Sequence, residues 1–315
     1  MNLDKLQVFT GNANPELARR VCARLELPLG DALVNRFPDG EINVKINDDV
    51  RNRDVFIVQP TCPPVNDSLM ELLLLVDTVH RASASRVTAV IPYFGYARKD
   101  RKDEGRVPIS AKLVANLITR AGVDRVLCLD LHAPQIQGFF DIPVDHLYSS
   151  AVLVRRFKKM KLPNLAVASP DVGGIKMARA YAKRLEADLV VIDKRRPRQN
   201  EAEVMNIIGD VEGKNILIVD DLVDTAGTLT NAVKALKGAG AKDVYAACTH
   251  PVLSGSAIER INGSGLAKMI VTDTLPQRIE SPVIETESVS HVFAEAMKRT
   301  FKHMSISSLF DIDKG

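Results

Sequence analysis

Cysteine is sparse in this sequence, and none of it forms a metal-binding or disulfide pattern. The four cysteines, Cys22, Cys62, Cys128 and Cys248, are scattered over 315 residues without a Cys-x-x-Cys pair. This spacing disfavours zinc and a disulfide framework, and it fits a reducing cytosol. Long apolar segments and a signal peptide are also missing from the sequence. We therefore expect a cytoplasmic protein with no membrane partner.

Charge of one sign is not in excess either. The chain carries 42 basic and 39 acidic residues, which leaves a formal net charge of +3. So small a charge does not indicate nucleic-acid binding, and basic residues matter here only where they cluster. An apolar content of 46% and a charged content of 26% are typical of a globular protein. The length suits two domains of ordinary size, each with its own core.

The most informative stretch of the sequence runs from Asn215 to Leu229. The apolar residues Ile216 to Val219 predict a buried strand, and Asp220 and Asp221 stand where that strand is expected to end. The turn Asp224 to Thr228 follows and opens a predicted helix. In an open parallel sheet, ligands bind beyond the carboxyl ends of the strands. The acids and the turn are therefore expected at a ligand site.

The residue types in this turn suit a phosphate group. Small residues at the start of a helix expose several backbone N–H groups, and Thr225 and Thr228 add hydroxyl donors. Gly227 allows a ligand to approach the backbone closely. The preceding acids are better placed for sugar hydroxyls, or for a metal ion held by those hydroxyls. The alternative is an ordinary strand end with a helix cap, but the whole string favours a phosphorylated sugar.

A second segment, Pro92 to Lys102, also follows a predicted strand. Three aromatic residues give way there to four basic residues within five positions. This composition suits a nucleotide, with cations for a triphosphate and a flat surface for the base. A solvated charged loop is an equally good interpretation of the residues alone.

Other polar residues follow strands too, and each has an ordinary alternative. His132 lies just past the predicted strand Arg125 to Leu129, where a lone histidine is most often a satisfied polar residue. Asp171 follows another strand, beside a pair of glycines. Residues 194–198 hold four cations in five positions, a pattern that stabilises a polyphosphate during transfer or forms a solvated loop. The segment 36–41 by itself indicates an ordinary Asp-Gly turn between two short strands.

The sequence also contains an internal similarity. Ala121-Gly122, Val126 and His132 recur at the same spacing as Ala239-Gly240, Val244 and His250. Both sets follow a predicted helix and span a strand. We therefore expect two similar α/β halves, joined near residues 145–151.

These segments together resemble class I ribose-phosphate diphosphokinase along essentially the whole chain. The loop 220–228 alone resembles the signature of every protein that binds 5-phosphoribosyl 1-diphosphate. The resemblance implies an α/β fold of two similar phosphoribosyltransferase-like domains, each a parallel sheet flanked by helices. The implied bounds are 1–147 and 148–302, with the tail at about 303–315 packed on the first domain. The matching segments are 37–41, 93–101, 130–138, 169–174, 193–198, 220–228 and 249–251.

The resemblance also implies a reaction. The family transfers the β,γ-diphosphate of ATP to the C1 hydroxyl of ribose 5-phosphate, with Mg²⁺, to give 5-phosphoribosyl 1-diphosphate and AMP for nucleotide biosynthesis. A phosphoribosyltransferase would share loop 220–228 but would not need segment 93–101. A non-catalytic regulatory homologue would have interrupted catalytic segments, whereas 194–198 and 220–228 are uninterrupted here.

Individual roles follow from the matching positions. Catalysis would be supported by Lys194 and Arg196, and the metal by His132 and Asp171. In the family, the segment that begins at Phe37 reaches the ATP site of a neighbouring subunit. The residues implied to bind ATP are Phe37, Asp39, Gly40, Glu41, Arg98, Lys99 and Arg101. The residues implied to bind ribose 5-phosphate are Arg196, Asp220, Asp221, Asp224, Thr225, Ala226, Gly227 and Thr228.

The resemblance further implies a homohexamer that phosphate activates and ADP inhibits, at a site between subunits. Two departures add negative charge near that site. Asp49 stands where a serine would match the regulated pattern, and Glu104-Gly105 stands where an Arg-Ser pair is common. We therefore expect weaker binding of both effectors. The matching regulatory positions are Arg51, Arg81, Ser83, Lys102, Ser305 and Ser307.

Overall fold

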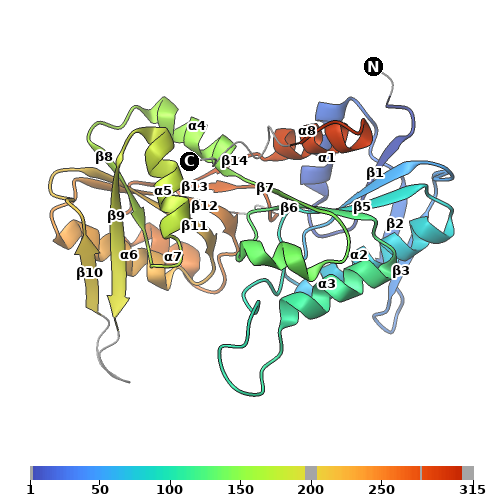
Figure 1. Ribbon diagram of the computed structural model, residues 1–315, viewed down its shortest axis with the longest axis horizontal. Helices are drawn as coiled ribbons and strands as arrows, with labels where there is room; N and C mark the ends of the chain where they lie inside the picture. Colours follow the sequence, from blue (N-terminus) through green and yellow to red (C-terminus); the bar gives the residue numbers. More distant parts are fainter. Residues whose placement is uncertain (1–2, 196–203, 277–278, 307–315) are drawn as a thin grey trace. The chain divides into compact units, whose positions relative to one another are not determined.

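The computed structural model describes residues 3–195, 204–276 and 279–306, which form two compact units. Each unit is built on a sheet of mostly parallel strands flanked by helices, which confirms the expected α/β class (Figure 1). One unit holds residues 3–148, 274–276 and 288–306. The other holds residues 149–195, 204–273 and 279–287. Within these described residues, no helix has both the length and the apolar character to cross a membrane.

The first unit has a five-stranded parallel sheet in the order β1-β4-β5-β6-β7. A separate antiparallel hairpin, β2 with β3, follows the first helix. The strands are β1 (Leu6–Thr10), β2 (Ala32–Arg36), β3 (Ile42–Ile46), β4 (Asp54–Val58), β5 (Arg86–Ile91), β6 (Arg125–Leu129) and β7 (Val144–Leu147). The helices are α1 (Pro15–Leu25), α2 (Val65–Arg81), α3 (Ser110–Ala121), the 3₁₀ helix η1 (Pro134–Phe139) and α8 (Ser290–Phe301).

The second unit has a seven-stranded sheet in the order β10-β9-β8-β11-β12-β13-β14, in which only the β9–β10 pair is antiparallel among the described strands. The strands are β8 (Leu165–Ser169), β9 (Asp188–Arg195), β10 (Val204–Ile208), β11 (Asn215–Val223), β12 (Asp243–Pro251), β13 (Lys268–Thr272) and β14 (Ile284–Glu287). The helices are α4 (Ser150–Met160), α5 (Ile175–Leu185), α6 (Gly227–Gly238) and α7 (Ala257–Asn262).

A continuous run of apolar residues on the central strand β11 explains why helices cover both faces of the second sheet. On β11, Ile216 and Ile218 join the core beneath α6 and α7, whereas Leu217 and Val219 join the core beneath α4 and α5. Successive side chains of a strand point to opposite faces, so a continuous apolar run fits a strand buried on both sides. The run that predicted this central strand therefore also accounts for its two layers of helices.

The C-terminal helix departs from the expected domain bounds. The units divide after Tyr148, one residue beyond the expected 147, but the second does not continue to 302. Helix α8 belongs instead to the first unit, where it packs beside α1 (Figure 1). The buried side chains of Phe293 and Met297 supply the apolar face of α8 for this packing. The expected tail, about 303–315, is described only as far as residue 306.

The internal similarity corresponds to a repeated structural unit. In the first unit, α3 ends at Ala121 and leads through Gly122 into β6, which pairs with β5. In the second unit, α6 leads through Gly240 into β12, which pairs with β11. Both glycines have positive φ angles, +110° and +90°, which glycine adopts without steric cost. The segments that follow β5 and β11 thus occupy equivalent places in the two sheets.

Candidate functional site

The acids of the second unit lie where one neighbour of β11 ends and the other continues. Pairing of β11 with β8 ends at Ile218, but pairing with β12 continues to Val223. The strand therefore runs past Asp220 and Asp221, three residues beyond the expected end at the first acid. The backbone of these acids therefore lies beyond the last residue pair that β11 forms with β8, Ile218 opposite Ala168. This is the ligand side of a parallel sheet.

Three carboxylates share this region. Burial raises the pKa of Asp220 well above its ordinary value, and the charges of Asp221 and then Asp171 raise it further. Asp171 belongs to the loop after β8, where its Oδ1 accepts a hydrogen bond from Gly174 N at 3.0 Å. Its backbone oxygen accepts one from Ser169 Oγ at 2.6 Å. The loop is thus held in place, and the clustered negative charge favours a nearby cation.

The turn after β11 is tethered through its carbonyl groups. The carbonyl oxygens of Val223 and Asp224 accept hydrogen bonds from Leu253 N and Ser254 N, at 3.1 and 3.0 Å. Arg260 in α7 donates from Nη1 to the Thr225 carbonyl at 3.2 Å. Sequence reasoning missed this arginine, because its contact joins segments 35 residues apart and no local motif marks it.

The start of α6 leaves room beside the backbone. Ala226, at the N-cap, adopts a left-handed conformation with φ +62°. Among the described residues other than its chain neighbours, a Cβ atom added at Gly227 would come within 4 Å of Thr225 Oγ1 only, at 3.9 Å. Backbone N–H groups at a helix start bind anions, and a non-glycine residue held in a strained conformation is common at functional sites. The anion site that the turn composition predicts at this helix start stays a prediction.

The predicted nucleotide turn of the first unit is an ordered hairpin end. Phe37 N donates to the Glu41 carbonyl, and Gly40 N donates to the Phe37 carbonyl, both at 2.9 Å. Glu41 N donates to Asp39 Oδ1 at 3.1 Å. These bonds fix the turn between β2 and β3, yet the Phe37 side chain is 49% exposed. A large aromatic ring held outward on a rigid turn is available to stack on a flat ligand.

The basic segment after β5 combines core residues with exposed cations. Phe94 packs edge to face against Phe140 at 5.8 Å, so this ring belongs to the core and is not a stacking surface. Gly95 N donates to Thr61 Oγ1 at 2.6 Å, and a Cβ at Gly95 would lie 2.3 Å from the Thr61 carbonyl. The backbone is therefore fixed just before the cations begin. Arg98, Lys99 and Arg101 are all exposed.

A pocket of about 560 Å³ lies at this segment. It brings two predicted cations, Arg98 and Lys99, beside residues that begin α2, whereas Arg101 does not line it. Lys99 Nζ contacts Asp103 Oδ2 at 2.7 Å, and this hydrogen bond raises the pKa of the lysine. The pocket is lined by Pro64, Val65, Asn66, Asp67, Tyr93, Tyr96, Arg98 and Lys99.

The loop after β6 is joined to the basic segment. Gln135 Nε2 donates to Asp100 Oδ2 at 2.7 Å, and His146 Nε2 accepts from Leu131 N at 2.9 Å. His132 is exposed between these contacts, at the carboxyl end of β6. It belongs to the first unit, whereas Asp171 belongs to the second. In the part of the chain that the structure describes, no group of three or more His, Cys, Asp or Glu residues is arranged to hold a metal ion.

Comparison with known proteins identifies the family. Residues 6–122 match the N-terminal domain of ribose phosphate pyrophosphokinase, and residues 197–311 match the phosphoribosyl synthetase-associated domain. The ribose-phosphate pyrophosphokinase of Chlorobaculum tepidum is 58% identical over 97% of this chain and 95% of its own length. That of Marinomonas sp. is 57% identical over 98% and 99%. The chain belongs to the ribose-phosphate pyrophosphokinase family.

A solved structure supports the same assignment. The phosphoribosylpyrophosphate synthetase from Mycobacterium smegmatis matches with a TM-score of 0.90 and 39% identity, covering 95% of this chain and all of that one. The chain is therefore an enzyme of a family that makes 5-phosphoribosyl 1-diphosphate. The phosphoribosyltransferase and the non-catalytic homologue are not favoured.

Of the two predicted catalytic cations, Lys194 lies within a strand, β9. This strand continues to Arg195 in pairing with β10, where Lys194 stands opposite Met205. Lys194 is thus part of an antiparallel pair at the backbone level. Arg196 lies outside the described residues.

Some of the predicted regulatory positions lie together in the first unit. Asn52 N donates to the Ser83 carbonyl at 3.0 Å, which places the loop holding Arg51 beside Ser83. Arg81 pairs with Asp77 at 2.7 Å on the exposed end of α2. The Asp49 carboxylate accepts from Arg51 N at 3.0 Å. Lys102 is exposed, the Ser305 carbonyl accepts from Arg299 Nη1 at 3.1 Å, and Ser307 lies outside the described residues.

The raised pKa of Asp220 predicts that the stability of the ligand-free protein falls as the pH rises. Between the ordinary aspartate pKa, about 3.9, and the raised folded value, the folded state binds more protons than the unfolded state, so stability declines as pH rises. Asp220→Asn removes this penalty. With a chelator present, we expect its Tm at pH 8 to exceed the wild-type value by about 2–4 °C, and the difference to vanish near pH 4.

Asp210, in the same unit, is the control for this measurement. Its hydrogen bond with Lys214 lowers its pKa, so the sign is opposite and Asp210→Asn is expected not to raise Tm at pH 8. Calorimetry of both variants across pH 4–8 gives the comparison. A lower Tm for Asp220→Asn than for wild type at pH 8 would show that the clustered acids do not destabilise the fold.

Proposed function

We propose that this chain transfers the β,γ-diphosphate of ATP to the C1 hydroxyl of ribose 5-phosphate, which gives 5-phosphoribosyl 1-diphosphate and AMP. Its identity to ribose-phosphate pyrophosphokinases over nearly the whole length carries the proposal. The open helix start after two acids supports the sugar-phosphate half of the reaction. The exposed cations after β5 support the nucleotide half.

The turn Asp224 to Thr228 would bind the 5-phosphate. Its carbonyl groups accept hydrogen bonds from residues 253–260, and backbone N–H groups at a helix start are suited to an anion. Thr225 and Thr228 would add hydroxyl donors. Asp220 and Asp221 would accept hydrogen bonds from the ring hydroxyls, because an ionised carboxylate is a strong acceptor for a hydroxyl donor.

The hairpin turn and the basic segment would bind ATP. Phe37 would stack on adenine, and Asp39 and Glu41 would accept from its amino group. Arg98, Lys99 and Arg101 would contact the triphosphate. We further propose a homohexamer, in which the exposed hairpin turn serves the ATP site of a neighbouring subunit.

A magnesium ion fits the residues present. Mg²⁺ prefers oxygen ligands, retains several waters and uses few protein groups, which agrees with clustered carboxylates that lack a three-ligand cage among the described residues. His132 and Asp171 would serve the metal sites, directly or through water. When bound, the ion would neutralise charge on the transferred diphosphate.

The protein's own residues would contribute to the transfer by positioning the two substrates and by stabilising the charge of the transition state. The C1 hydroxyl would attack the β-phosphorus in line, and AMP would leave without a covalent enzyme intermediate. Lys194 and Arg196 would stabilise the charge that develops in the transition state. Thus the residues with the largest effect on the rate are expected on the β9 segment, and those with the largest effect on sugar binding at the start of α6.

The reaction type has a direct test. Purified protein incubated with ATP, ribose 5-phosphate and Mg²⁺ should release AMP, in amounts equal to the 5-phosphoribosyl 1-diphosphate formed. Chromatography of the nucleotides and of the sugar phosphates measures both products. Formation of ADP in place of AMP would contradict attack at the β-phosphorus.

The sugar loop can be tested with one hydroxyl. Thr228→Val keeps the shape of the side chain and removes a donor to the 5-phosphate, so the KM for ribose 5-phosphate should rise about tenfold or more, while the KM for ATP stays nearly unchanged. Thr230→Val is the matched control, because Thr230 donates internally to the Gly227 carbonyl at 3.2 Å. Equal effects of Thr228→Val on both substrates would indicate a collapsed loop instead.

Regulation by phosphate and ADP can be tested at Asp49. A carboxylate about 4 Å from a bound phosphate opposes it by a few kcal/mol at an effective dielectric near 20. Asp49→Ser removes the charge and keeps an oxygen that accepts from Arg51 N. We expect half-activation at a lower phosphate concentration in this variant. An unchanged phosphate titration would show that Asp49 does not face the effector.

A further inference from the structure

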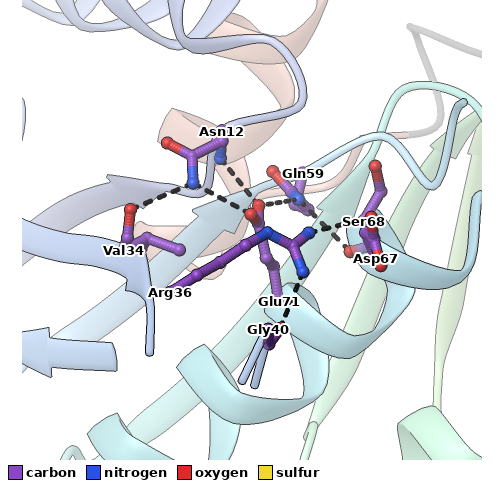
Figure 2. A network of polar contacts seen from close by, with 8 residues as sticks. All are labelled: Asn12, Val34, Arg36, Gly40, Gln59, Asp67, Ser68 and Glu71. Carbon is purple, nitrogen blue, oxygen red and sulfur yellow. Dashed lines mark hydrogen bonds and ion pairs between the residues drawn. The ribbon is translucent and has the colours of Figure 1, made fainter. Parts of the chain in front are cut away.

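The hairpin that carries Phe37 is fastened to α2 by a polar network that none of the roles above uses (Figure 2). The network has an inner part around Glu71 and an outer part around Arg36 and Asp67. Both acids belong to α2 and lie four residues apart, so they stand one turn from each other along the helix. The two parts hold the hairpin at different points of β2.

The inner part is a buried carboxylate with three donors. Glu71 is only 6% exposed. Its Oε2 accepts from Asn12 N at 2.8 Å and from Gln59 Nε2 at 2.9 Å, and its Oε1 accepts from Asn12 Nδ2 at 2.9 Å. The same Nδ2 also donates to the Val34 carbonyl in β2 at 3.1 Å. This part is a structural anchor, because a buried carboxylate must keep its partners.

The outer part bridges the turn and the helix with one guanidinium group. Arg36 Nη2 lies 2.8 Å from Asp67 Oδ2, and Arg36 Nη1 donates to the Gly40 carbonyl at 2.9 Å. The two side chains of the ion pair are 46% and 42% exposed. An ion pair so exposed contributes little to the stability of the fold. Its geometry nevertheless fixes the angle between the turn and α2, because a planar guanidinium group contacts both at once.

Asp67 also lines the pocket that holds Arg98 and Lys99. One carboxylate thus borders the basic segment and holds the turn that presents Phe37. The bond from Arg36 to the Gly40 carbonyl reaches the middle of that turn, between Phe37 and Glu41.

We propose that Arg36 and Asp67 are positioning residues that set the turn Phe37 to Glu41 for recognition of the adenine base. This inference rests on the proposed role of that turn in ATP binding. Arg36 and Asp67 touch neither the base nor the reacting atoms in this proposal. Without their contact the turn keeps its internal hydrogen bonds but samples other orientations relative to α2, so ATP binding bears the cost of ordering it.

Two substitutions with opposite effects on charge test the proposal. Asp67→Asn removes a negative charge beside Arg98 and Lys99, and Arg36→Gln removes a positive charge. A purely electrostatic effect on a triphosphate would move the KM for ATP in opposite directions for the two variants. The proposal predicts a rise of about fivefold in both, the cost of one exposed charged contact, with the KM for ribose 5-phosphate unchanged.

Base selectivity provides a second readout, because it would stay unchanged if Arg36 and Asp67 only stabilised the fold. The ratio of kcat/KM for ATP to that for GTP should fall in both variants, because a loosely held turn discriminates poorly between bases. The double variant should match the single variants, since the two residues share one contact. Glu16→Gln is the control, because it breaks a comparably exposed ion pair with Arg20 on α1, 3.1 Å long, far from the turn in sequence.

A second measurement does not depend on activity. The chain contains no tryptophan, so Phe37→Trp places a single reporter on the turn. Time-resolved fluorescence anisotropy of this protein without nucleotide should show faster local motion once Asp67→Asn is added, and no change once Glu16→Gln is added. Glu71→Gln, by contrast, should lower the Tm, because its amide group faces donors in a buried site.

The outcomes separate this inference from the proposed function. If wild type makes no AMP, the proposed function fails, whatever the anisotropy shows. A different result overturns the positioning role while the function stands. In that case wild type makes AMP, but Asp67→Asn and Arg36→Gln leave the KM for ATP and the preference for ATP over GTP unchanged. The motion of Trp at position 37 also stays slow. Opposite shifts in the KM for ATP would also overturn it, in favour of simple electrostatics.

Discussion

The candidate sugar site depends on unequal pairing of the central strand β11. Pairing with β8 stops at Ile218 while pairing with β12 continues to Val223, so β12 holds the backbone of Asp220 and Asp221 extended beyond the pairing with β8. Continued pairing with β12 also brings residues 253–260 under the following turn, where they bind its carbonyl groups. The acids and the turn that follows them are therefore positioned by the same interaction, and neither requires a long loop. The cost is electrostatic, because Asp220 is crowded by burial and by two neighbouring carboxylates.

The first unit uses the equivalent place in its sheet differently. The segment after β5 is anchored by Gly95 against Thr61 and by Phe94 in the core, and the cations that follow are exposed. In the second unit, the equivalent turn is short, and its charged groups are acids. A repeated strand–helix–strand frame thus supports a cationic segment in one unit and an acidic one in the other. This arrangement is suited to a reaction in which one substrate is a polyphosphate and the other offers sugar hydroxyls.

Local patterns in the sequence were enough to predict the central strands and the family. The run Ile216 to Val219 indicates a buried strand, and small residues before a helix indicate an anion site, because both signals depend on neighbours in sequence. Features that depend on distant partners were not predictable. The extension of β11 to Val223 comes from β12, the tether of Thr225 comes from Arg260, and the place of α8 comes from packing on α1. Phe94 looked like part of a base-stacking surface, but only its contact with Phe140 reveals it as a core residue.

The two acids of α2 show why sequence alone does not distinguish an anchor from a positioning residue. Asp67 and Glu71 have the same chemistry and lie one turn apart, yet Glu71 is buried with three donors and Asp67 is half exposed with one arginine. Burial makes the contacts of Glu71 indispensable to the fold, since an unpaired buried carboxylate is strongly destabilising. Exposure makes the contact of Asp67 nearly dispensable to the fold, so what it controls is orientation. The buried contacts of Glu71 thus keep the hairpin in place, and the exposed contact of Asp67 with Arg36 orients its turn for a ligand.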